Sequence, residues 1–187
     1  MTEPTASTDP AAAQSDGIVP DTKDWTWVLD EPCPECGFVA ADVEVPAIGD
    51  AVRAGLPRWR SALARPEVTA RPAPGVWSVL EYGAHVRDVF RVFDERLGLM
   101  LSQHDPLFAN WDQDAAALAG DYASQDPARV AVELEESGRA VAERFDAVAP
   151  GQVERVGRRS NGSVFTVRTL GRYFLHDVEH HLHDVRA

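Results

Sequence analysis

The chain has 187 residues, 30 of them acidic and 18 basic, which gives a formal net charge of −12. A surface this acidic repels nucleic-acid phosphates and anionic lipid, so we exclude both as partners. No apolar run is as long as a membrane span, and the first residues lack the basic start and apolar core of a signal peptide. We therefore expect a soluble, cytoplasmic protein, long enough to form one self-supporting hydrophobic core.

Two segments precede the main domain. Residues 1–21 contain hardly any large apolar side chains, so we expect a disordered N-terminal tail. Residues 22–44 contain two tryptophans and then the run Cys33-Pro34-Glu35-Cys36-Gly37. We expect this second segment to be an ordered extension whose tryptophans pack onto a main body formed by residues 45–187.

Cys33 and Cys36 are the only cysteines, and their spacing is that of one half of a zinc ribbon, in which two thiolates share an ion with a second pair. The sequence has no second cysteine pair. Four alternatives stay open: recruitment of histidines, a metal bound across a dimer, a redox dithiol, or two buried thiols beside the tryptophans. Two cysteines do not suggest the disulfide framework of a small secreted protein.

The first half of the main body contains two segments with helical periodicity. The first extends from about Pro46 to Ala64, and Gly55 and Pro57 predict a kink or break inside it. The second starts at the capping-box run Ser78-Val79-Leu80-Glu81, and the Asp-Pro dipeptide at 105–106 ends it. The following stretch, to about residue 122, is less regular.

The second half contains two more helical segments. Asp126 followed by Pro127 starts the third, which ends at Pro150-Gly151. Residues 155–167 are rich in Gly and Ser with short runs of β character, and Thr166 is a suitable N-cap for a last helix that ends near residue 185. These features predict an all-α four-helix bundle with long crossover connections and a short irregular or β-like loop before the last helix.

Four of the six histidines lie in this last helix. With Val167 at the centre of the apolar stripe, His181 falls about 40° and Asp177 about 80° to one side of it. His176 and His180 fall about 180° and 140° away, so in a straight helix they face solvent. Only the Asp177/His181 pair, one helical turn apart, lies beside the core.

A metal site can be assembled from this pair and one further histidine. His85 lies at the edge of the apolar stripe of the second helix, so it can meet Asp177 and His181 across the bundle. Two imidazoles and a carboxylate suit Zn, Ni, Fe(II) or Mn, and three protein ligands leave a position for water or substrate. The alternative is structural: His85 as a hydrogen-bonded core residue and the last-helix histidines as a solvated face.

Three motifs, in this order and spacing, resemble the DinB/YfiT-like metal-binding four-helix bundles. The run Trp77-Ser78-Val79-Leu80-Glu81 followed by His85 resembles the second helix of that family. Gly157-Arg158-Arg159-Ser160-Asn161-Gly162 followed by Thr166-Val167 resembles its loop before the last helix, and His180-His181-Leu182 followed by Val185 resembles its final helix. The resemblance covers residues 45–187 and implies the same bundle.

The resemblance also implies which residues bind the metal. The family has its first metal histidine on the second helix, at the position of His85, and two ligands four residues apart on the last helix, usually both histidine. Alignment on the final-helix motif puts these two at Asp177 and His181, whereas a shifted alignment uses His176 and His180. The mycothiol-dependent maleylpyruvate isomerases of the superfamily use a His, Glu and His set, so an acid is compatible with the pattern.

Relatives of this kind include bacillithiol and mycothiol S-transferases, which present a low-molecular-weight thiol to a metal. The resemblance therefore implies a thiol-dependent, mycothiol-type transferase or isomerase that acts on a small-molecule substrate, with the metal activating the thiol. Usage rich in Ala, Arg and Asp with few lysines suggests an actinobacterial source, where mycothiol is the natural thiol. A non-catalytic metal or small-molecule binding protein is the alternative, and a homodimer stays open.

Overall fold

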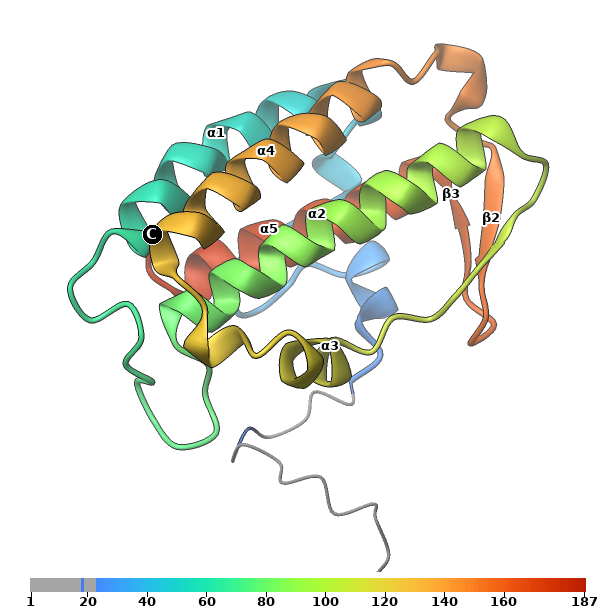
Figure 1. The fold of residues 1–187 in the computed structure, drawn as a ribbon. Coiled ribbons are helices and arrows are strands. Elements are labelled where there is room, and N and C mark those ends of the chain that lie inside the picture. Colours follow the sequence, from blue (N-terminus) through green and yellow to red (C-terminus); the bar gives the residue numbers. More distant parts are fainter. Residues whose placement is uncertain (1–17, 19–22) are drawn as a thin grey trace, which may run out of the picture.

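The computed structural model describes Ile18 and residues 23–187, so the predicted N-terminal tail lies outside the described residues apart from Ile18. Four long helices form a bundle (Figure 1): α1 (Val45–Leu63), α2 (Val79–Ser102), α4 (Pro127–Asp146) and α5 (Val167–Asp184). Among the described residues, every helix is too short or too polar to serve as a membrane span. The predicted all-α four-helix bundle is confirmed.

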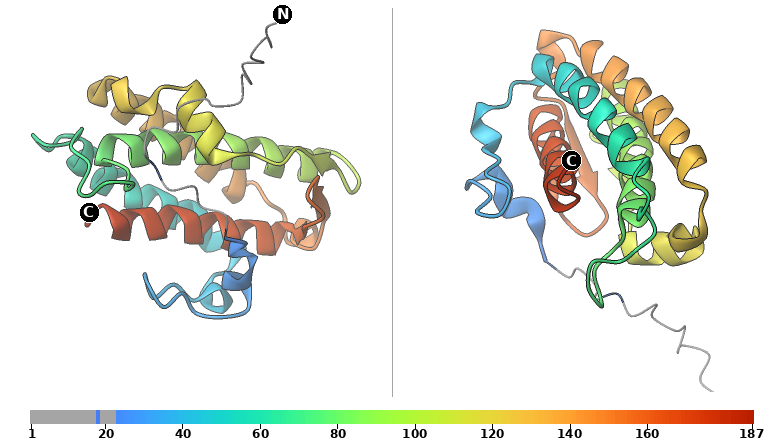
Figure 2. Two further views of the ribbon diagram at one scale, coloured as in Figure 1. Left: turned by 90° about the horizontal axis from the view of Figure 1, so that it is seen from below. Right: turned by 90° about the vertical axis from the view of Figure 1, so that its left-hand side faces the viewer.

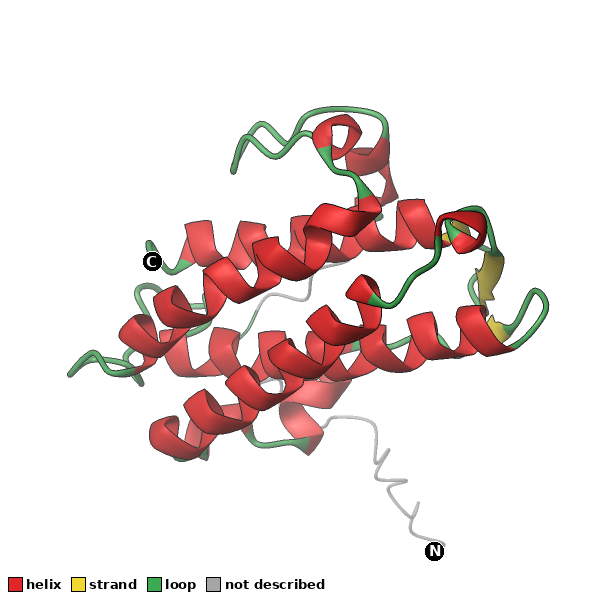
Figure 3. Ribbon diagram, turned by 90° about the horizontal axis from the view of Figure 1, so that it is seen from above, coloured by secondary structure: helices red, strands yellow, loops and turns green. Residues whose placement is uncertain are grey.

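The four helices enclose one apolar core. α4 packs against both α1 and α2, and α5 contacts the same two helices from the opposite side (Figures 2 and 3). Gly138 of α4 allows a close approach there, because a Cβ at this position would lie 2.6 Å from Leu56 and 2.9 Å from Phe90. The largest buried aromatic side chains of this core are Trp59, Tyr122, Phe90, Phe93, Phe145 and Phe174.

Three of the predicted helix starts are confirmed by capping hydrogen bonds. At α2, the backbone N–H of Glu81 donates to Ser78 Oγ (3.3 Å), and the backbone N–H of Ser78 donates to Glu81 Oε2 (2.7 Å). Asp126 caps α4 by accepting from the N–H of Ala128 at 2.9 Å. Thr166 caps α5 by accepting from a backbone N–H one turn later. The starts of α2, α4 and α5 are therefore encoded locally, whereas α1 begins with Pro46 in its first turn and without a side-chain cap.

α1 is one continuous helix through Gly55 and Pro57, so of the predicted kink or break, the break is wrong. Pro57 cannot donate a backbone hydrogen bond, which weakens the helix at this point. Leu56 and Trp59 on either side of it are buried in the core. A Cβ at Gly55 would lie 3.2 Å from a methyl group of Leu182 in α5. Tertiary packing of this face therefore outweighs the local helix-breaking tendency.

The connection from α2 to α4 contains more regular structure than the sequence predicted. A short strand β1 (Leu107–Phe108) is followed by the helix α3 (Gln113–Ala119). Asp112 starts α3 by accepting hydrogen bonds from the N–H groups of Asp114 and Ala115. α3 has only seven residues and none of them is buried. Such a helix has no apolar stripe, so the sequence pattern does not reveal it.

The predicted β-like loop before the last helix is confirmed as a small sheet. Strands β2 (Val156–Arg159) and β3 (Val164–Thr166) are antiparallel, and β1 adds to β2 in parallel, so the strand order is β1-β2-β3. The sheet closes one end of the bundle and leads directly into α5 (Figure 1).

The segment that precedes α1 lies along α5. It contains two 3-10 turns, Trp25–Leu29 and Ala40–Asp42. Arg172 of α5 donates to the carbonyl oxygen of Val43 at 2.9 Å. α5 is therefore covered on one side by this extension and on the other by the rest of the bundle (Figure 2).

Candidate metal centre

The structure brings together three residues that the helical periodicity selected. His85 projects from α2, and Asp177 and His181 project from successive turns of α5. His181 Nε2 lies 3.0 Å from Asp177 Oδ1, and His85 Nε2 lies 3.7 Å from the same oxygen. One potential ligand atom from each residue falls within 4.8 Å of the other two, so one ion can contact all three.

The His85 ring is fully buried, with 0% of its surface exposed. Among the described residues, neither of its ring nitrogens has a hydrogen-bond partner. The rings of Trp77 and Trp111 flank it, at centroid distances of 5.1 and 5.4 Å. Burial lowers the pKa of His85, which keeps the imidazole neutral and able to donate a lone pair to a metal. An unsatisfied buried polar group costs about 1–3 kcal/mol, so a ligand for this ring is expected.

His181 lies between two carboxylates. Its Nε2 atom contacts Asp177, and its Nδ1 atom lies 2.9 Å from Asp184 Oδ2. Burial disfavours the charged ring, but the hydrogen bonds to the two carboxylates outweigh it and raise the pKa of His181 to about 9. For Asp177, burial by itself would raise the pKa of the carboxyl group. The neighbouring imidazoles of His181 and His85 outweigh burial and hold that pKa well below its usual range. A histidine held by a carboxylate on its far nitrogen is a common arrangement for a metal ligand.

A pocket of about 280 Å³ opens beside Asp177 and His181. Its wall includes the aromatic side chains of Trp77, Tyr82 and Tyr173. A metal held by three protein ligands here would keep a side open to the pocket, as catalytic rather than structural sites do. The two nitrogens and the carboxylate oxygen suit the divalent ions Zn, Ni, Fe or Mn. Asp184 also lines the pocket. Its position three residues after His181, on the same side of the helix, is the sequence signal for a carboxylate that contacts this histidine.

His176 and His180 do not face solvent as predicted, because only 3% and 6% of their surfaces are exposed. The helical periodicity was right that they point away from the core, but the extension covers that side of α5. The structure does not bring them to His85. They group instead with Cys33 and Cys36. Burial, together with the charge of the neighbouring His180, lowers the pKa of His176 to about 4.

Comparisons with known proteins agree with this architecture. No curated protein matches the sequence. The solved structure described as "YfiT from Bacillus subtilis is a probable metal-dependent hydrolase with an unusual four-helix bundle topology" is similar, with a TM-score of 0.63 and 20% identity over 74% of this chain and 81% of that chain. At this level of identity the likeness shows a shared fold. The family model of the DinB superfamily matches residues 49–185, and the chain therefore belongs to the DinB superfamily.

Proposed function

We propose that the protein binds a divalent metal ion through His85, Asp177 and His181 and uses it to activate a low-molecular-weight thiol of the mycothiol type. The thiolate sulfur would then bond to an electrophilic carbon of a small molecule, with the S–H proton passing to the product or to its leaving group, or it would add reversibly during an isomerisation. The observation that carries the proposal is the buried His85 ring, whose nitrogens have no hydrogen-bond partner among the described residues although it lies beside Asp177.

The charges around the pocket support a bound cation. Four carboxylates line it, those of Glu35, Asp114, Asp177 and Asp184, and no arginine or lysine of the described chain does. An anionic thiolate would be repelled by such a wall unless a positive charge were present. A bound divalent ion supplies that charge and lowers the pKa of a coordinated thiol.

The protein's own residues have separate roles in this proposal. His181 would hold the metal through Nε2 and would keep its Nδ1 proton on the side of Asp184. Asp184 therefore fixes the orientation of the ring, as outer carboxylates do for many metal-binding histidines. Trp77 and Trp111 cover His85 and exclude water from that side of the site. Trp77 and Tyr82 offer apolar surface to the substrate.

Hydrolysis of a small molecule is the second candidate. The structurally similar protein from Bacillus subtilis is described as a probable metal-dependent hydrolase. The same open pocket can admit water in place of a thiol. A non-catalytic metal or small-molecule binding protein is the third candidate, since fold alone does not determine chemistry.

Metal analysis of protein purified without a histidine tag tests the first step. We expect His85→Ala and His181→Ala each to lose one equivalent of metal per chain relative to the wild type. His183→Ala is the matched control, because this exposed histidine lies on the same helix outside both groups of potential ligands. Full metal occupancy in both test variants would overturn the proposal.

A thiol titration tests the second step. The metal site is loaded with Co(II), mycothiol is added, and the difference spectrum is recorded. We expect a new thiolate-to-cobalt absorption that is absent in His181→Ala, together with thiol-dependent turnover of an electrophilic substrate. Turnover without thiol would indicate hydrolysis. Metal binding with neither a spectral change nor turnover would indicate the non-catalytic role.

A further inference from the structure

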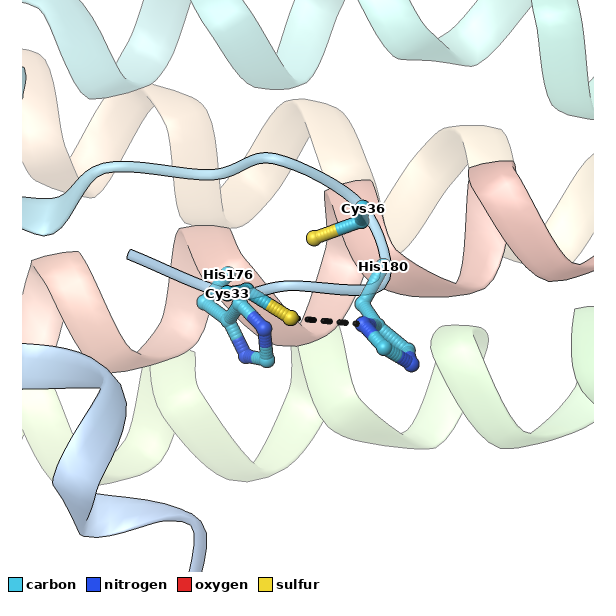
Figure 4. A group of neighbouring side chains, drawn as sticks. All are labelled: Cys33, Cys36, His176 and His180. Atoms are coloured by element: carbon cyan, nitrogen blue, oxygen red, sulfur yellow. Dashed lines mark hydrogen bonds between the residues drawn. The ribbon is translucent and has the colours of Figure 1, made fainter. Parts of the chain in front are cut away.

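We infer that Cys33, Cys36, His176 and His180 bind a second metal ion, zinc, in a closed tetrahedral site that fastens the N-terminal extension to α5. Figure 4 shows the two cysteines, on a loop of the extension, next to the two histidines of the helix. One potential ligand atom from each residue lies within 4.8 Å of the other three. The site shares no ligand with the first metal centre and does not depend on the proposed activity.

The distance between donor atoms suits zinc. Cys33 Sγ lies 3.6 Å from His180 Nδ1. Zinc–sulfur bonds of about 2.3 Å and zinc–nitrogen bonds of about 2.1 Å, at a tetrahedral angle, separate sulfur and nitrogen by about 3.6 Å. The two side chains are therefore already at the spacing that a shared zinc ion requires.

The loop that carries the cysteines is shaped so that both thiols can reach one ion. The N–H of Gly37 donates to the carbonyl oxygen of Cys33, and the N–H of Cys33 donates to that of Phe38, both at 2.9 Å. Gly37 has a φ of +76°, a conformation that favours glycine. A tight turn with a glycine after the second cysteine is consistent with the zinc-ribbon half that the sequence suggested.

α5 supplies the other two ligands from one face. His176 and His180 are one helical turn apart, so their rings lie one above the other. Their ring centroids are 5.1 Å apart. Nε2 of His176 is buried and has no hydrogen-bond partner in the described part of the chain. His180 Nε2 lies 3.6 Å from Glu35 and 3.7 Å from Asp184, which leaves its Nδ1 atom, beside Cys33, to bind the metal ion.

The burial of the group indicates a structural role. Cys33 is 1% exposed, and His176 and His180 are almost as deeply buried. Cys36 is half-buried, so the three deeply buried members are Cys33, His176 and His180. Two thiolates and two imidazoles complete the coordination of zinc and leave no open position for a substrate.

The site would also shape the pocket of the first metal centre. Trp25 of the extension lies against the His176 and His180 rings, with centroid distances of 5.6 and 5.2 Å. Trp25 and Glu35 both line that pocket. A zinc ion that holds the loop on α5 therefore also holds one wall of the pocket.

Metal counting on the full chain tests the inference. We expect Cys33→Ser/Cys36→Ser to lose one equivalent of zinc and to retain the metal that depends on His85. In Co(II)-loaded protein, thiolate-to-cobalt absorption should be present in the wild type and in His183→Ala but absent in the double variant. Equal zinc content in the double variant and the wild type would overturn the inference, and so would a Cys33–Cys36 disulfide in freshly purified protein.

A second measurement does not require the variant to fold. Wild-type protein is titrated with a mercurial that modifies thiols, and released zinc is followed with a chromogenic chelator. We expect one zinc to be released for every two thiols modified. The same release should occur from His85→Ala, which separates failure of this site from failure of the first. Modification of both thiols with no zinc release would contradict the inference.

Discussion

The two faces of α5 carry potential ligand groups of opposite character. The face toward α2 contributes Asp177 and His181 to a group with three ligands, nitrogen and oxygen donors and an adjoining pocket. The face toward the extension contributes His176 and His180 to a group with four potential ligands, two of them thiols, of which all but the half-buried Cys36 are deeply buried. Three ligands beside a pocket are typical of a catalytic metal site, whereas four ligands that include thiolates are typical of a structural one. The number of histidines in a segment does not distinguish the two.

Adjacent residues of one helix serve the two groups. His180 and His181 are neighbours in the sequence, but consecutive side chains of a helix point about 100° apart. Asp184 lies between the two groups, with Oδ2 at 2.9 Å from His181 Nδ1 and Oδ1 at 3.7 Å from His180 Nε2. The two groups are thus distinct in their ligands but share one acidic neighbour.

The largest effect is expected when the carboxylate of the pocket-side group is removed. Asp177→Ala should weaken metal binding at this group by more than about 100-fold, because a direct ligand matters more than an outer-shell partner. Asp177→His restores a ligand at the same position, so it should retain the metal. Competition titration with a metal-binding dye measures both affinities. Equal loss in the two variants would show that Asp177 acts through packing and not as a ligand.

A smaller effect on metal affinity is expected from substitution of Asp184, the acidic residue between the two groups. Asp184→Asn should weaken metal binding by about 10–100-fold at the pocket-side group, because His181 loses the charged acceptor of its Nδ1 proton. Zinc at the Cys33/Cys36 group should be unchanged, since Asp184 Oδ1 lies 3.7 Å from His180 Nε2, beyond hydrogen-bond distance. Simultaneous loss of both metals would contradict the separation of the two groups.

Removal of the enclosed metal should release the extension while the bundle stays folded. In Cys33→Ser/Cys36→Ser, or after zinc is stripped with a chelator, limited proteolysis should cut within residues 23–44 several times faster than in the wild type. The core of the four long helices lies outside this segment, so helical circular dichroism should change little. Asp177→Ala is the comparison, because it should lose the pocket-side metal without faster cleavage.

The smallest effect is expected on the stability of the fold, from the capping residue Glu81, which belongs to neither group of potential ligands. Glu81 is buried at the start of α2; burial opposes its charge, but hydrogen bonds from Arg71 and Ser78 hold its pKa below the ordinary value of 4.5. Since the folded-state pKa is the lower one, this stabilisation is present above about pH 4.5 and is lost as the pH falls further.

Glu81→Gln should therefore lower the free energy of unfolding by about 1 kcal/mol at pH 7. Urea unfolding at a series of pH values measures the difference, which should shrink below the ordinary pKa of the carboxyl group. Both metal sites should bind as in the wild type. A difference that is independent of pH would mean that the Glu81 charge contributes nothing.

Much of the fold was determined by the sequence alone, because its signals are local. The side chains of Ser78, Asp126 and Thr166 cap the helices that follow them, and each hydrogen bond spans only two or three residues. The apolar periodicity of α5 likewise placed Asp177 and His181 beside the core, where the structure has them. Such features depend on the axis of a single helix, so one sequence is enough to predict them.

Tertiary structure alone decided what covers the outer face of α5. Cys33 and His180 are separated by 147 positions in the chain. Helical periodicity shows that His176 and His180 point away from the core, but it cannot show that an extension lies over them. Tertiary packing likewise keeps α1 helical at Pro57, where the residue type alone predicted a kink or break. Both outcomes depend on burial between distant segments, which is a property of the folded chain and not of any local pattern.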